Sequence, residues 1–252
     1  MRGQEIYYEI HGRGVPVVML HHGFGSSKMW KKIFPSLVEA GYQVVMYDRP
    51  GYGRSAGGDD FNETYVSDAF RSECVRELDQ LINFLDLDSF HLVGQCEGGV
   101  IAVDYAAQFA DRVKTVVTSS TLCRSKFTMT DFNKGKFPLS FQELEPGMRD
   151  KLIYWHGADY AESFYNRCRR YGGAYGRDYF DLRPELSKVD CPALVIYPDR
   201  SSLFEVEQGV DFYRHLPAGE LAVLAKCGHN TYEQQPGEYV HQILGFLGRH
   251  HS

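Results

Sequence analysis

A cysteine stands at the centre of a short glycine-rich segment that follows an apolar run. The segment Gly94 to Gly99 reads GQCEGG, and it comes directly after Phe90 to Val93. A strand that turns sharply into a helix needs small residues two positions before and after the central residue, because that residue is strained and the neighbouring chain passes close by. Such a turn lifts the central side chain above the sheet and directs it at the positive end of a helix. The pattern therefore predicts Cys96 as a nucleophile.

A histidine near the C-terminus is the best candidate for the base that activates this cysteine. His229 follows the apolar run Leu221 to Leu224 and precedes the helix-like run Pro236 to Leu247. On a loop in this place an imidazole can swing into the site, take the thiol proton and later return a proton to the leaving group. The other histidines lie at the terminus or in positions that packing or solvent exposure explains. We therefore expect His229 to be the general base.

The acid that orients this histidine should follow an intervening strand at its carboxyl end. Asp199 follows the run Ala193 to Tyr197, and Glu205 is the reserve candidate. The chain order nucleophile, acid, histidine is the order expected for a nucleophile on a strand-turn-helix. The sequence predicts a triad of Cys96, His229 and Asp199, with the capping of a loop as the alternative role for Asp199.

Two backbone N–H groups are predicted to hold the oxyanion of an acyl-transfer intermediate. Phe24 lies in the turn His21 to Gly25 after another strand, and Glu97 follows the nucleophile. Each such donor contributes about 3 kcal/mol in known cases. For the side chain of Glu97 we favour a solvated carboxylate in a first helical turn. The alternatives are that it keeps the Cys96 thiol protonated or contacts a polar group of the substrate.

The elements that must position these residues alternate between short β-rich runs and amphipathic helical runs. This alternation predicts an α/β protein with a mostly parallel sheet covered by helices on both faces. Helices are expected at Thr64 to Leu85, Gly98 to Phe109 and Pro236 to Leu247. The expected strands are Val17 to Leu20, Gln43 to Tyr47, Phe90 to Val93, Val113 to Val117, Ala193 to Tyr197 and Leu221 to Leu224.

One segment interrupts the alternation and is rich in aromatic residues, glycine and charge. We expect residues 122–186 to form a helical lid, and residues 1–121 and 187–252 to form the core. Trp155, Tyr160 and Phe164 of this insert are predicted to bind the acyl part of a substrate, or else to form the lid's own small core.

Composition excludes several classes of function. The chain has 27 basic and 33 acidic residues among 252 and a net charge of −6, which argues against a nucleic-acid partner. The first ten residues lack the continuous apolar stretch of a signal peptide, and no later segment is long and apolar enough to span a membrane, so we expect a cytoplasmic protein with a small-molecule acyl substrate and no membrane partner. The six cysteines form no paired C-x-x-C pattern, and we expect neither a metal nor another cofactor.

Taken together, four motifs resemble those of the α/β-hydrolase superfamily over essentially the whole chain. They are His22 to Gly25, Asp48 to Ser55, Gly94 to Gly99, and Gly228-His229 with Glu233 and Pro236. The resemblance implies an eight-stranded sheet, a lid over the pocket, a structural role for the Asp48 to Ser55 loop, and cleavage of an ester, thioester or related bond without a cofactor.

The cysteine is a departure, because most members of this superfamily carry serine where this chain has Cys96. Dienelactone hydrolases and polyhydroxyalkanoate synthases have a similar G-x-C-x-G-G box, and an engineered replacement of serine would also explain it. We predict a hydrolase of esters or thioesters that acts through an acyl-enzyme on Cys96. An acyltransferase with the same intermediate, or a receptor that binds a ligand without turnover, are the alternatives.

Overall fold

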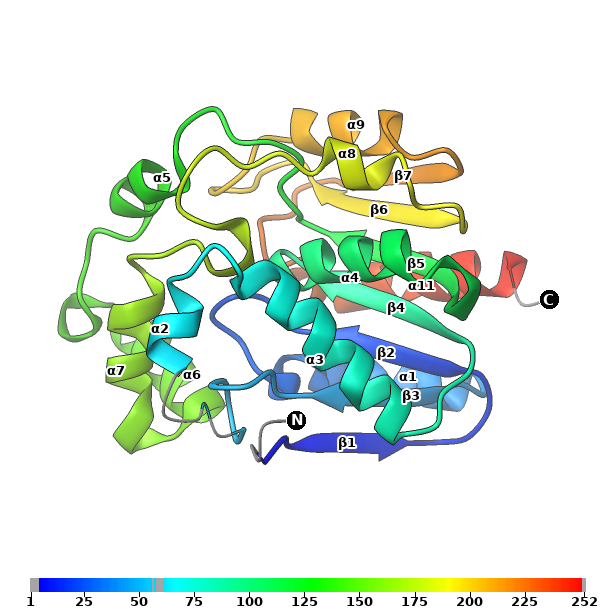
Figure 1. The fold of residues 1–252 in the computed structure, drawn as a ribbon, viewed down its shortest axis with the longest axis horizontal. Helices are drawn as coiled ribbons and strands as arrows, with labels where there is room; N and C mark the ends of the chain where they lie inside the picture. Colours follow the sequence, from blue (N-terminus) through cyan, green and yellow to red (C-terminus); the bar gives the residue numbers. More distant parts are fainter. Residues whose placement is uncertain (1–4, 56, 58–60, 251–252) are drawn as a thin grey trace.

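A single seven-stranded sheet forms the centre of the molecule (Figure 1). The computed structural model describes residues 5–55, 57 and 61–250. The strand order is β1-β3-β2-β4-β5-β6-β7, and only β1 runs antiparallel to its neighbour. The strands are β1 (Tyr8–His11), β2 (Pro16–Leu20), β3 (Gln43–Tyr47), β4 (Phe90–Gln95), β5 (Val113–Ser119), β6 (Ala193–Pro198) and β7 (Gly219–Leu224).

The six strands expected from the sequence correspond to β2 through β7. The strand β1 was missed because its four residues alternate between exposed and half-buried at the edge of the sheet, and so present no apolar run. The described part of the chain has seven strands, so the eighth strand implied by the family resemblance is a correction. Residues 5–7, which precede β1, form no strand.

Helices cover both faces of the sheet and divide the core in two. On one face α3 (Phe70–Phe84) and α4 (Glu97–Gln108) pack against Val18, Leu20 and Val45; on the other, α1 (Phe34–Glu39) and α11 (Pro236–Arg249) pack against Val17 and Met19 (Figure 1). This division follows from the alternation of side chains along each strand. The remaining elements of the core are η1 (Ser27–Lys32), α2 (Phe61–Tyr65), η2 (Ala110–Arg112), α9 (Glu207–Arg214) and α10 (Thr231–Gln234).

The single helix expected at Thr64 to Leu85 is divided into α2 and α3. Ser67 closes a turn between them, since both its backbone N–H and its hydroxyl donate to the carbonyl of Thr64. Serine competes with the helical hydrogen-bond pattern in this way.

Between β5 and β6 the chain forms a series of helices, which lie mainly beyond the carboxyl ends of the parallel strands (Figure 1). Helices α6 and α7 pack against each other, whereas α8 contacts α4. Within the described residues, no helix has the length and apolarity needed to cross a bilayer. The elements of this segment are α5 (Met129–Lys136), η3 (Phe141–Glu143), α6 (Pro146–His156), α7 (Ala158–Cys168), η4 (Gly173–Tyr175) and α8 (Arg183–Leu186).

Candidate active site

Cys96 occupies a strained turn between β4 and α4. Its backbone has φ +53° and ψ −114°, a conformation that a residue with a side chain adopts only when its surroundings enforce it. Its N–H donates to the carbonyl of Ser119 at 2.7 Å. A Cβ at Gly98 would collide with the carbonyl of Leu20, and a Cβ at Gly94 with the carbonyl of Gly98. The two glycines are therefore required by close backbone approach.

The sulfur of Cys96 has two hydrogen-bond donors near it. The hydroxyl of Tyr175 lies 3.5 Å from Sγ, and the backbone N–H of Glu97 also donates to the sulfur. Burial raises the pKa of the Cys96 thiol to about 12 and outweighs both donors. At neutral pH the group is a thiol, and a base must remove its proton when it reacts.

His229 lies on the loop after β7 and is neutral at pH 7, because burial lowers its pKa to about 4. Its backbone carbonyl accepts hydrogen bonds from Gln95 Nε2 at 2.9 Å and from Ser120 Oγ at 2.7 Å. These contacts fix the histidine loop above the ends of β4 and β5. The ring nitrogen Nδ1 lies 3.2 Å from the hydroxyl of Ser201.

The carboxylate of Asp199 is directed elsewhere, which differs from the predicted triad. Its Oδ1 accepts the backbone N–H of Cys227 at 3.0 Å, and the backbone N–H groups of Lys226 and Cys227 lower its pKa. Asp199 thus ties the end of β6 to the loop after β7, the capping role considered as the alternative. The reserve candidate Glu205 pairs with Lys126 at 2.5 Å.

The position facing His229 is filled by Ser201, which the sequence reasoning missed. Ser201 follows Asp199 by two residues in the same loop, and its hydroxyl also accepts the backbone N–H groups of Leu203 at 3.2 Å and Phe204 at 3.1 Å. A serine in a loop carries no distinctive sequence signal. Only the folding of this loop indicates its role.

Of the two predicted oxyanion donors, one points at the nucleophile and one does not. The N–H of Glu97 faces Sγ, as described above. The N–H of Phe24 instead donates to Nδ1 of His22 at 3.2 Å, and Nε2 of His22 lies 3.1 Å from the hydroxyl of Tyr232. His22 thus holds this loop in its present conformation.

The side chain of Glu97 is buried, so the predicted solvated carboxylate is wrong. It is 3% exposed, and its Oε1 pairs with the guanidinium of Arg49 at 2.7 Å and accepts the N–H of Ala174 at 3.2 Å. Arg49 is buried as well and stacks on Tyr52. A buried carboxylate persists only when it is paired in this way, and the pairing could not be read from the sequence because Arg49 lies 48 residues earlier.

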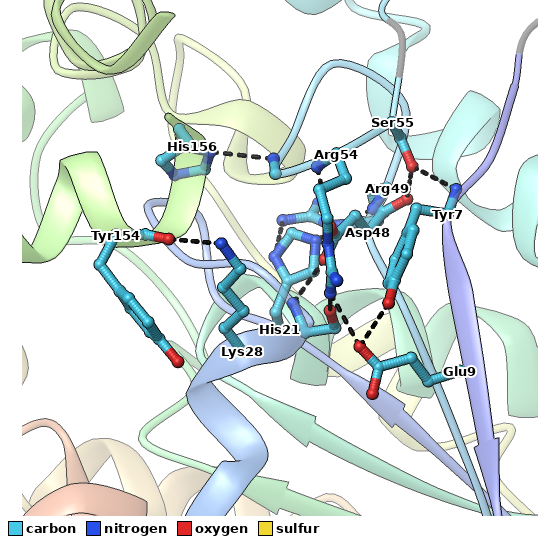
Figure 2. Close-up of polar contacts among 12 residues, drawn as sticks. Tyr7, Glu9, His21, Lys28, Asp48, Arg49, Arg54, Ser55, Tyr154 and His156 are labelled. Atoms are coloured by element: carbon cyan, nitrogen blue, oxygen red, sulfur yellow. Dashed lines mark hydrogen bonds and ion pairs between the residues drawn. The ribbon is translucent and has the colours of Figure 1, made fainter. Parts of the chain in front are cut away.

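Hydrogen bonds around Asp48 and Arg49 hold the loop from Asp48 to Ser55 (Figure 2). The Asp48 carboxylate accepts the N–H groups of Ser27 at 2.6 Å and Arg54 at 2.8 Å, and the hydroxyl of Ser55 donates to the Asp48 carbonyl. The N–H of Arg49 donates to His21, whose pKa burial lowers well below its ordinary value. This network gives the loop the structural role that the resemblance implied.

Above Cys96 and His229 lies a cavity of about 600 Å³. Trp155 lines it, whereas Tyr160 and Phe164 do not. Tyr160 donates to the carbonyl of Gly51 at 2.9 Å, and Phe164 stacks on His156 at 3.8 Å between ring centres. The two rings pack the insert against the core, which differs both from the predicted contact with substrate and from the lid's own small core that was its alternative. Further apolar walls come from Met129, Phe132, Phe137, Leu152, Tyr175 and Phe204.

In this mostly parallel sheet, one strand turns through a strained residue into a helix, and a histidine lines the cavity above that turn. This arrangement defines an α/β enzyme of the hydrolase type. Residues 15–177 match the model of the alpha/beta hydrolase fold family, and the chain belongs to that family. It is a hydrolase of the α/β family.

Relatives of nearly full length have different recorded activities. A proline iminopeptidase of Lactobacillus crispatus (strain ST1) is 26% identical, with 98% of this chain and 96% of the relative covered. A 2-hydroxy-6-oxononadienedioate/2-hydroxy-6-oxononatrienedioate hydrolase of Dechloromonas aromatica (strain RCB) is 25% identical, with 96% and 90% covered.

Solved structures agree in fold. A bromoperoxidase from Bacillus anthracis is 28% identical with a TM-score of 0.73, and 97% of this chain and 96% of that chain are covered. The enol-lactonase from Burkholderia xenovorans LB400 is 20% identical with a TM-score of 0.76 and coverages of 98% and 97%. At that identity the enol-lactonase informs the fold alone.

Proposed function

We propose that this hydrolase cleaves a carboxylic ester or thioester of a small molecule through an acyl-enzyme on Cys96, with His229 as general base. The observation that carries this proposal is that Cys96, held in a strained turn, lines the same cavity as His229. A nucleophile and a base that line the same largely apolar cavity are the minimum that acyl transfer through a covalent intermediate requires.

In the first step the thiol attacks the carbonyl carbon while His229 takes its proton, so that an S–C bond forms and the oxyanion develops beside the Glu97 N–H. The intermediate collapses, and the leaving group departs with the proton from His229. In the second step His229 takes a proton from water, which attacks the thioester. The acid product leaves and the thiol of Cys96 is restored. For this role the proton of the His229 ring is on Nδ1, beside the Ser201 oxygen, and Nε2 is free to act as the base.

The walls of the cavity favour an apolar acyl group. Among the described residues of the lining, the one carboxylate is that of Glu97, which is paired with Arg49. Lys151 is paired with Glu233. The remaining lysine, Lys136, donates to the carbonyl of Ser202 at 2.5 Å. The names of the relatives, an iminopeptidase and a dioate hydrolase, differ in the bond attacked, so we base the substrate class on the cavity.

One observation favours a second candidate, a receptor that binds its ligand without turnover. His229 faces a neutral hydroxyl and not a carboxylate, so nothing in the contacts of its ring stabilises an imidazolium. A site of this kind binds an acyl compound in the cavity but cleaves it slowly.

Turnover of p-nitrophenyl esters and acyl thioesters of increasing chain length tests the two candidates. We expect Cys96→Ala to abolish turnover, Cys96→Ser to reduce it strongly, and Cys191→Ala to leave it unchanged, because Cys191 lies outside the cavity lining. Native rates in Cys96→Ala would refute the nucleophile. Ligand binding without turnover in the native protein would favour the receptor, and a product that depends on an added alcohol or amine would indicate an acyltransferase.

A further inference from the structure

At Cys96 one backbone N–H is available to an oxyanion, whereas two backbone donors are usual in an oxyanion hole. The N–H of Phe24 is occupied by Nδ1 of His22, and that nitrogen is available as an acceptor because Nε2 of His22 can donate to the Tyr232 hydroxyl. The N–H of Glu97 remains. Loss of a single donor from an oxyanion hole typically costs a factor of about 10² to 10³ in rate, so a second donor is expected elsewhere.

The hydroxyl of Tyr175 lies where a second donor is needed, beside the sulfur of Cys96. Its side chain is buried, and Oη lies 3.5 Å from the sulfur of Cys96. The backbone N–H of Leu122 donates to the same oxygen at 3.4 Å. That bond uses one of the two lone pairs of Oη and leaves the phenolic proton available for donation toward Cys96. Burial keeps the phenol protonated, since it raises the pKa of Tyr175 well above its ordinary value.

The short helix η4 that carries Tyr175 is held by the residue that supplies the other donor. The Glu97 carboxylate accepts the N–H of Ala174 at 3.2 Å, and an added Cβ at Gly173 would lie 2.7 Å from both carboxylate oxygens. Gly173 has φ +57°, which a glycine adopts without strain. Glu97 therefore fixes its own backbone N–H and the hydroxyl of Tyr175 relative to each other.

We propose that Tyr175 is a further catalytic residue, whose phenolic hydroxyl donates to the developing oxyanion beside the N–H of Glu97. Both donors face Sγ in the free protein. When a carbonyl carbon bonds to Sγ, its oxygen lies two bonds from the sulfur and enters the reach of the same two groups. The assignment rests on the acyl-enzyme chemistry proposed above, because it needs an oxyanion formed at Cys96.

The test compares the binding of two inhibitors with the same apolar tail. A trifluoromethyl ketone forms an anionic hemithioketal with Cys96 and so needs the oxyanion donors, whereas the matching methyl carbinol only fills the cavity. In Tyr175→Phe we expect affinity for the trifluoromethyl ketone to fall by about 10² to 10³ fold and the acylation rate to fall equally, with carbinol binding unchanged. Tyr179→Phe is the matched control, because Tyr179 is 72% exposed and lies outside the cavity lining.

The outcomes separate this assignment from the proposed function. A wild-type protein that forms neither a hemithioketal nor an acyl-enzyme would overturn both. A wild-type protein that is acylated, with Tyr175→Phe acylated at the same rate, would overturn the role of Tyr175 alone. If Tyr175→Phe fails to fold, 3-fluorotyrosine at position 175 keeps the ring and makes the hydroxyl a stronger donor. Tighter binding of the ketone by this variant would support the role, and unchanged binding would overturn it.

Discussion

The reactive groups of this site are both uncharged at neutral pH. Burial raises the pKa of the Cys96 thiol to about 12 and lowers that of His229 to about 4. A resting thiolate–imidazolium pair is therefore disfavoured, and the proton must move to His229 as the sulfur attacks. In this respect the site resembles a serine hydrolase more than a cysteine protease, in which the thiolate exists before the substrate arrives.

Ser201→Asp should create the carboxylate partner that His229 lacks. The backbone N–H groups of Leu203 and Phe204 that now bind the Ser201 hydroxyl are available to hold a carboxylate oxygen. A carboxylate beside the ring raises a histidine pKa by about one to three units and stabilises the imidazolium. We expect acylation about tenfold faster or more, and an upward shift in the acidic limb of the pH profile of kcat/KM.

Ser201→Ala is the matched control for that prediction and should be slower than the native protein, because Nδ1 loses its partner. An unchanged pH profile and rate in Ser201→Asp would show that the Ser201 side chain does not govern the state of His229.

At the scale of elements, η4 and the turn into α4 form one unit joined by Glu97. Gly173→Ala tests this unit. Alanine at φ +57° is strained by about 1 to 2 kcal/mol, and its Cβ would also displace the Glu97 carboxylate at a further cost of about 1 to 3 kcal/mol. We expect Gly173→Ala to reduce both the free energy of unfolding and the acylation rate.

Gly176→Ala separates strain from contact, because Gly176 has φ +74° but no atom within 4 Å of the added Cβ. Denaturant unfolding should show the smaller loss in Gly176→Ala, with acylation near native. Equal effects of the two substitutions on acylation would argue against a coupling between η4 and Glu97.

The helices, strands and loops show most clearly how much of the structure could be predicted from the sequence. The apolar runs predicted β2 to β7, and the glycine spacing predicted the turn at Cys96, because periodicity and backbone sterics are local. Local sequence could not show that Ser201, and not the predicted Asp199, faces His229. That arrangement depends on how the loop after Pro198 folds back, where the N–H of Asp199 donates to Leu224 and its carboxylate accepts from Cys227. Pairs of residues that lie far apart in the chain, such as Arg49 and Glu97, also leave no periodic pattern in the sequence.

For the whole molecule, the buried histidines predict a loss of stability in acid. Burial lowers the pKa values of His156 and His229 to about 4, and those of His21 and His22 in the same direction. A histidine with a depressed folded-state pKa is protonated first in the unfolded chain, so the free energy of unfolding falls as the pH drops from 6.5 toward 4. Each such group contributes up to about 1.4 kcal/mol per pH unit in that window.

The carboxyl of Glu77 acts in the opposite direction, because burial raises its pKa to about 7 and the folded state then binds the proton more tightly between pH 7 and 4.5. With four histidines against it, we expect a net loss of stability, measured by denaturant unfolding at pH 7, 6 and 5. His156→Gln should reduce the slope of the free energy of unfolding against pH by the equivalent of about one proton. A free energy of unfolding that is flat or rises on acidification would contradict these burial effects.

The central claim is that Cys96 becomes acylated. The most direct measurement is the intact mass of the protein after rapid acid quenching of its reaction with a p-nitrophenyl ester, followed by peptide mapping of the modified residue. We predict one acyl group on Cys96 within the first turnover, and none on the Cys96→Ala protein. Multiple turnovers with no acyl group on Cys96, or an acyl group on another residue, would contradict the account.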